Sequence, residues 1–224
     1  MKYYKVLKAD GTCCNGGKGK WYLPEKLADG TWKPGRWMPE IEGKLIPCER
    51  GYHICRPDDL VYWLDETIYE VEYEGKIVED DNKCVVRRAR LLRRVETWTE
   101  RTARLFAADC AEHILHIFET EYPDDDRPRN AIQAARDYAN GLITESELEE
   151  MWYASWYASA AEYAAASAAW SARSAACSAE YAACSAARSA ARSAAWYAER
   201  SWQTEKLFEY LEGSRRRCNL FEEK

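Results

Sequence analysis

The sequence predicts an α+β protein, in which a small β-rich module is followed by an all-helical, alanine-rich bundle. Three observations lead to this prediction. Residues 1–96 hold nine of the eleven glycines and five of the seven prolines, which is typical of short strands joined by turns. Helical periodicity begins after Thr97, and residues 151–202 contain 22 alanines and 10 serines. The contrast predicts a domain boundary near Glu96, with domains at 1–96 and 97–224.

The β-rich module is expected to form a small mixed or antiparallel sheet. Residues 3–7 are predicted as its first strand, and residues 67–74 alternate apolar with acidic side chains, as a half-buried strand does. Glu74 and Gly75 are then expected to turn the chain. Three short strands should follow: residues 76–78, 84–86 and 90–95.

Short helices are predicted on both sides of the boundary. Residues 56–64 fit a helix opened by proline. After the boundary, apolar residues recur at helical spacing from 105 to 118, and Tyr122-Pro123 ends that helix. The next helix starts at Pro128 and stops near Asn140, just before a glycine.

A long alanine-rich segment follows, and a Thr144/Glu147 capping box is expected to start its helix. No glycine or proline follows before Gly213, and one straight helix would span roughly 100 Å, so we expect a bend or a hairpin. Large side chains recur at every seventh position: Trp156, Tyr163, Trp170, Cys177 and Cys184. Alanines on nearly the opposite side form a small-residue seam. That seam fits either a central helix or a contact with a second copy of the chain.

Composition and charge restrict the function. A formal net charge of −6 and a pI near 5.3 argue against nucleic acid as the partner of the whole surface. No apolar run is long enough for a membrane span, and the first residues lack the apolar stretch of a signal peptide. Nine cysteines without a secretory signal are expected to be reduced thiols. We therefore expect a cytoplasmic protein.

Two groups of residues have metal-ligating side chains. Cys48, His53 and Cys55 are weak candidates for a zinc site, because their spacing departs from paired CxxC knuckles. Buried thiols are the favoured interpretation, and neither a metal nor a cofactor is predicted. On the helix after the boundary, we expect solvated i,i+4 pairs, Asp109 with His113 and Glu112 with His116.

Five arginines form the clearest charged cluster and are the candidates for binding a partner: Arg87, Arg88, Arg90, Arg93 and Arg94. A second cluster lies at 215–217. The alternative is that the cluster pairs with the chain's own acids at 79–81 or 124–126. Trp156, Tyr163 and Trp170 from the heptad row are further candidates for contact with a partner.

The second module carries a sequence that points to a family. Residues 107–113 read AADCAEH, residues 125–136 read DDRPRNAIQAAR, and the alanine-rich segment follows. From about residue 98 to 211, this pattern resembles an all-helical family of immunity proteins from bacterial toxin–immunity loci. The resemblance implies that the protein binds and neutralises another protein.

The first module has resemblances of its own. Cys48-x-x-Gly51-Tyr52-His53-x-Cys55 and the strands around Gly75 resemble a small domain of unknown function common in bacteriophages and prophages. Residues 67–72 with the polar loop at 79–82 are also similar to small rifampin-type ADP-ribosyltransferases. That likeness implies an NAD-using enzyme with Tyr52 and His53 in the nucleotide cleft and an acid among Glu70, Glu72 and Glu74 on the ribose.

The leading hypothesis from the sequence is a non-enzymatic protein, phage- or prophage-borne, that acts in phage–host or toxin conflict. It would sequester or block a host defence factor or a toxin. The alternatives are an ADP-ribosyltransferase-like enzyme with Tyr52, His53 and Glu72 as its catalytic residues, and a homo-oligomeric structural module closed through the alanine seam.

Overall fold

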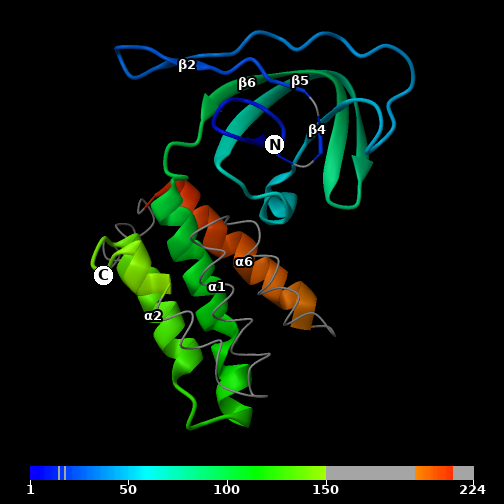
Figure 1. The fold of residues 1–224 in the computed structure, drawn as a ribbon. Coiled ribbons are helices and arrows are strands. Elements are labelled where there is room, and N and C mark those ends of the chain that lie inside the picture. The colour runs from blue at the N-terminus through cyan, green and yellow to red at the C-terminus, as the bar shows by residue number, and fades with distance from the viewer. Residues whose placement is uncertain (15, 18, 150–194, 214–224) are drawn as a thin grey trace, which may run out of the picture. The chain divides into compact units, whose positions relative to one another are not determined.

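A computed structural model describes residues 1–149, except Asn15 and Lys18, and residues 195–213 (Figure 1). The chain divides into two compact units, Met1–Glu96 and Thr97–Lys224. Strands and one 3-10 helix make up the regular structure of the first unit, and α-helices that of the described part of the second. The predicted α+β fold, with the β-rich part first, is confirmed.

The first unit is built on a four-stranded antiparallel sheet with the order β1-β5-β6-β4. Its strands are β1 (Tyr3–Leu7), β4 (Tyr52–Ile54), β5 (Thr67–Asp80) and β6 (Lys83–Arg94). Two short strands, β2 (Glu25–Lys26) and β3 (Trp32–Lys33), form a separate hairpin, and a 3-10 helix, η1 (Pro57–Tyr62), follows β4. The short helix predicted after Arg56 is therefore confirmed.

The turn predicted at Gly75 is wrong. β5 continues through Gly75 to Asp80, and the chain reverses at Asp81-Asn82. Gly75 has a φ of +83° and lies at a register shift between β5 and β6, which is a β-bulge. Glycine suits a bulge and a turn for the same reason, because both require positive φ. The short strands predicted at 76–78, 84–86 and 90–95 are consequently parts of two long strands.

One core cluster of the first unit lies on a face of this sheet where Leu7, Ile54 and Leu91 are fully buried, and the equally buried Ile68 and Val85 lie on the other face. Gly51 brings β4 close to β6. A Cβ atom at Gly51 would lie 2.1 Å from Cγ1 of Val85, and its φ is +134°. Only glycine fits this position, and the following two residues, Tyr52 and His53, take their places from it.

The helical unit contains α1 (Glu100–Glu121), α2 (Arg127–Ala139) and α6 (Ala195–Glu212). Thr99 and Thr102 form a capping box that starts α1, and Tyr122 ends it. Gly141, with a φ of +72°, lies just beyond α2. Both predicted helices are therefore confirmed. Among the described helices, none is long and apolar enough to cross a membrane.

The predicted capping box at Thr144 is also present. The backbone N–H and the hydroxyl of Thr144 donate to Glu147 Oε2, at 2.7 and 2.8 Å, and the N–H of Glu147 donates back to Thr144 Oγ1. A helix follows through residue 149. The predictions for Trp156, Tyr163, Trp170 and the alanine seam lie outside the described residues, as does the arginine cluster at 215–217.

Candidate functional site

The predicted arginine cluster lies on β6, next to the acidic residues of β5. Three directly facing pairs connect the two strands, and we call them the Glu–Arg ladder: Glu70–Arg93, Glu72–Arg90 and Glu74–Arg88. The guanidinium of Arg93 donates twice to the Glu70 carboxylate, at 2.6 and 2.8 Å. The other two pairs have contacts of 2.6 and 2.8 Å. Alternation places Glu70, Glu72 and Glu74 on one face of β5, and the register shift after Glu70 brings Arg93 into the same row as Arg88 and Arg90.

The ladder changes the acidity of Glu70. The hydrogen bonds from Arg93, reinforced by Lys2, lower the pKa of Glu70 to about 2. Arg88 and Arg90 each place a guanidinium over the Trp37 ring, at 5.0 and 4.6 Å from its centre.

The acid partners predicted at 79–81 and 124–126 are wrong for Arg88, Arg90 and Arg93. These arginines pair instead with Glu74, Glu72 and Glu70 of the facing strand.

The two remaining arginines of the cluster have other environments. Arg87 holds a neighbouring loop by donating to the carbonyl oxygens of Ile41 and Gly43, the latter at 2.8 Å. Arg94 has a buried Nε with no hydrogen-bond partner among the described residues. The cluster predicted from the sequence is thus a row of paired side chains together with one loop anchor.

The residues proposed for ADP-ribosyl transfer have separate roles. The hydroxyl of Tyr52 donates to the carbonyl oxygen of Pro39 at 2.8 Å, and Glu72 is paired in the ladder. His53 Nε2 accepts a hydrogen bond from the backbone N–H of Cys48 at 2.8 Å. Of the three, only His53 lines the pocket described next.

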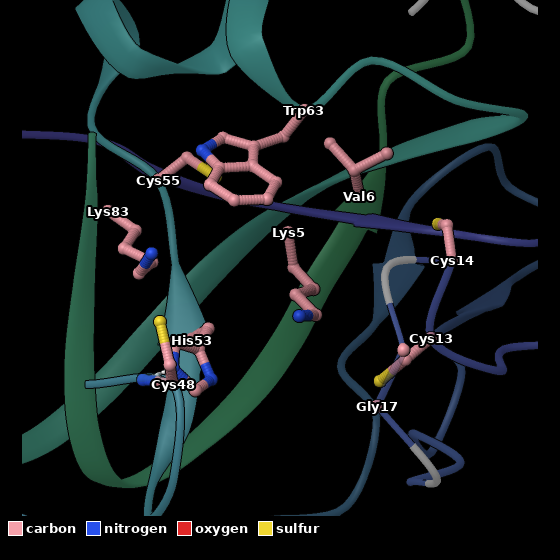
Figure 2. A pocket seen from close by; sticks show the side chains of 11 residues that line it. Lys5, Val6, Cys13, Cys14, Gly17, Cys48, His53, Cys55, Trp63 and Lys83 are labelled. Atoms are coloured by element: carbon pink, nitrogen blue, oxygen red, sulfur yellow. Dashed lines mark hydrogen bonds between the residues drawn. The ribbon is translucent and has the colours of Figure 1, made fainter. Parts of the chain in front are cut away.

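Cys48, His53 and Cys55 come together around one cavity of about 310 Å³ (Figure 2). Burial raises the pKa of Cys55 to about 12, so its thiol stays protonated. Among the described residues, no group of three or more His, Cys, Asp or Glu side chains is placed to hold a metal ion. Sequence reasoning found these three residues by their spacing. It missed the lysines and the tryptophan that line the same cavity, because they are distant in sequence.

The helical unit contains a second polar centre, where Asp109 of α1 joins α2 and α6. Its carboxylate accepts hydrogen bonds from Arg136 Nη2 and from the Tyr210 hydroxyl, both at 2.8 Å, and lies 3.3 Å from Lys206 Nζ. Arg136 also donates to both oxygens of Glu112. We call Asp109, Glu112, Arg136, Lys206 and Tyr210 the Asp109 cluster. These partners lie far apart in sequence, so spacing along α1 gave no signal for them.

The histidine pairs predicted on α1 are wrong. His113 lies 3.2 Å from Glu199 of α6 and stacks on Trp202, with ring centres 3.8 Å apart. Glu199 is only 6 % exposed and accepts a hydrogen bond from the fully buried Gln203. Burial raises the pKa of Glu199. Packing of α6 against α1 offers these side chains partners that a solvated helix would lack.

Two families match the chain. Residues 93–206 match the family described as Imm-5 like putative immunity protein, and residues 1–103 match a domain of unknown function (DUF7666). The resemblance of the second part to an immunity-protein family and that of the first part to a domain of unknown function are thereby confirmed. No curated protein matches the chain, and no solved structure does.

Proposed function

The chain belongs to the Imm-5 like putative immunity protein family, and from this membership we propose that it is a non-enzymatic inhibitor that binds and blocks another protein. The match over residues 93–206 is the observation that carries the proposal. The proposal includes a phage- or prophage-borne origin and action in the cytoplasm against a toxin or a host defence factor. Free thiols at Cys13, Cys48 and Cys110 support a reducing compartment.

The polar centres of the helical unit support binding rather than catalysis. Asp109 accepts from Arg136 and Tyr210, and Glu199 is engaged by His113 and Gln203. A general acid or base must reach the proton that it transfers, and these carboxylates use their oxygens to hold helices together. These two carboxylates therefore have the geometry of structural residues that connect helices.

The contact residues that we propose are the five arginines of β6, together with Trp156, Tyr163 and Trp170. Arginine beside an aromatic ring is typical of binding hot spots, and Arg88 and Arg90 lie over Trp37. Arg93 is half exposed, with 51 % of its side chain accessible. An acidic surface on the partner would be attracted to this row and would gain charge-assisted hydrogen bonds.

Capture followed by a functional readout tests the proposal. The full chain serves as bait in lysates of uninfected and phage-infected bacteria. We expect one protein in equimolar ratio. If that protein is a toxin, co-expression of the chain relieves the growth arrest that it causes; if it is a defence factor, co-expression increases plaque formation. A folded bait that captures no equimolar protein, or a capture without either effect, contradicts the proposal.

A charge swap tests whether the arginines contact the captured protein. The double variant E72R/R90E keeps a facing ion pair on β5 and β6 and leaves the net charge of the chain unchanged. We expect its affinity for the partner to fall at least about tenfold, because one interfacial charge-assisted contact contributes roughly 1.5–3 kcal/mol. Unchanged affinity in a variant with the parent melting temperature would remove the ladder from the binding surface.

The enzyme alternative makes a different prediction. If Tyr52, His53 and Glu72 were catalytic, millimolar NAD would give an ADP-ribosylated product. We expect none, because the Tyr52 hydroxyl and the Glu72 carboxylate already have partners within the unit. A product that disappears in Glu72→Gln would replace the inhibitor proposal with the enzyme.

A further inference from the structure

The charged side chains that line the cavity of the β-rich unit are positive. Two lysines enter its lining, Lys5 from β1 and Lys83 from the start of β6 (Figure 2). Its other lining residues are neutral when His53 is unprotonated, and none of the described lining residues carries a carboxylate: Val6, Cys13, Cys14, Gly16, Gly17, Cys48, His53, Cys55 and Trp63. In a protein with an excess of acids, a cavity whose only charged lining side chains, among the described residues, are two lysines favours the binding of an anion.

Both ammonium groups are held by aromatic rings. Lys5 Nζ lies 5.3 Å from the Trp21 ring centre, and Lys83 Nζ lies 5.2 Å from that of Trp63. Lys83 Nζ lies 3.5 Å from a carboxylate oxygen of Asp80, whereas the described residues supply no ion-pair partner for Lys5. Figure 2 shows the two side chains on opposite sides of His53, with Lys5 directed into the open space. The cavity therefore holds more positive than negative charge.

His53 reports this field. Burial lowers the pKa of His53, and the positive charges of Lys5 and Lys83 lower it further. Its Nε2 accepts from the Cys48 backbone N–H, so the neutral ring carries its proton on Nδ1. Cys48 has a φ of 65°, which is uncommon for a residue other than glycine, and it lines the cavity together with Lys83. The turn before β4 thus holds His53 in place through the Cys48 N–H.

We propose that this cavity binds a small molecule that carries a phosphate group, with the phosphate between Lys5 and Lys83 and Trp63 against the rest of the ligand. A phosphate monoester carries a charge of about −1.5 to −2 at pH 7, which matches two ammonium groups. A cavity of about 310 Å³ lies at the lower end of the range of small-molecule sites. The proposal is independent of the protein-binding function, because it concerns a different set of residues.

The test uses inorganic phosphate as the probe and the histidine ring signals of the full chain as the readout. The chain has three histidines, and the His53→Gln variant assigns the signal of interest. At constant ionic strength, phosphate should shift the His53 signal saturably. It should also raise the pKa of His53, because an anion beside the ring favours imidazolium. Chloride and acetate serve as comparison anions.

Two lysine variants and a matched control locate the site. Lys5→Gln and Lys83→Gln should each weaken phosphate binding about tenfold, since each removes one charge-assisted contact. Lys8→Gln removes the same charge from an exposed position that does not line the cavity, and should leave binding unchanged. Matching far-ultraviolet circular dichroism spectra establish that the variants are folded.

Three results would overturn the proposal. The first is a parent His53 signal that does not respond to phosphate. The second is an equal loss of binding in all three lysine variants, which would indicate general attraction to a charged surface. The third is a stronger response to acetate than to phosphate, which would make the site one for carboxylates.

Discussion

In the β-rich unit, acids and arginines meet on an open face of the sheet, whereas in the helical unit they meet between packed helices. Glu70 in the ladder is held by Arg93 and Lys2, and these hydrogen bonds lower its pKa to about 2. Glu199 has a histidine and a glutamine beside it, yet burial raises its pKa. The comparison shows that the balance between desolvation and hydrogen bonding decides which protonation state of a paired acid is favoured.

The two arrangements also differ in redundancy. The ladder repeats the same contact three times along two continuous strands, so each pair can be lost without separating the strands. The Asp109 cluster instead directs hydrogen bonds from α2 and α6 to one carboxylate. Loss of that carboxylate leaves Arg136 and Tyr210 partly buried with fewer acceptors.

The largest effect is therefore expected at Asp109. Asp109→Ala should lower the free energy of unfolding of the helical unit by about 2–3 kcal/mol, because it removes one partner of several partly buried polar groups. Urea denaturation followed by circular dichroism at 222 nm measures the change. Asp124→Ala, at an exposed position after α1, is the matched control and should be nearly neutral. Equal stability of the two variants would refute the central role of Asp109.

A smaller effect is expected in the ladder. Removal of one pair in E72A/R90A should cost about 1 kcal/mol or less, the range of cross-strand and exposed ion pairs. A double-mutant cycle with the two single variants isolates the coupling between the side chains. A coupling energy as large as the Asp109→Ala effect would mean that the ladder is as important to its unit as the Asp109 cluster is.

The smallest effects concern pH, and here the two units should differ in sign. The lowered pKa of Glu70 stabilises the fold above the unfolded value near 4.5, and this contribution is lost as pH falls toward 2. The raised pKa of Glu199 has the opposite consequence, since its contribution is lost as pH rises through the folded pKa. The difference in the free energy of unfolding between the parent and Glu70→Gln should therefore become smaller as pH falls. The free energy of unfolding of Glu199→Gln should rise relative to that of the parent as pH rises.

Urea unfolding across pH 2–8 measures both trends. Glu74→Gln is the control for Glu70, because it removes a ladder carboxylate of the same type that is more exposed, with 52 % of its side chain accessible against 14 %. Parallel pH profiles for Glu70→Gln and Glu199→Gln would contradict the difference between the two environments.

Local signals in the sequence predicted much of the fold. Alternation along β5, the proline of η1, Gly141 beyond α2 and the Thr144 capping box each depend on neighbours within a few residues, and each is present. Gly75 was misinterpreted because positive φ serves turns and bulges equally. Once the hairpin is placed at Asp81-Asn82, its register brings Glu70, Glu72 and Glu74 of β5 opposite arginines of β6.

The candidate sites were less accessible to sequence reasoning. Cys48, His53 and Cys55 were found together because eight residues contain them all. Lys5, Trp63 and Lys83 join them only through the sheet, and nothing in local spacing relates these positions. The same holds for Asp109 and Tyr210, which are 101 residues apart. Sites assembled by long-range packing need the fold before they can be recognised.

The outer strands of the sheet meet each other. Tyr4 of β1 and Cys55, just after β4, exchange two backbone hydrogen bonds, of 2.9 and 2.8 Å. Residues 35–41 run along β6 beyond β4 and bond to Leu91, Ala89 and Arg87. An unpaired edge recruits foreign strands through backbone groups, largely irrespective of their sequence. Where these backbone groups are already bonded, attachment by strand addition is blocked. A partner of this sheet would therefore be recognised through side chains, which can distinguish one protein from its close variants.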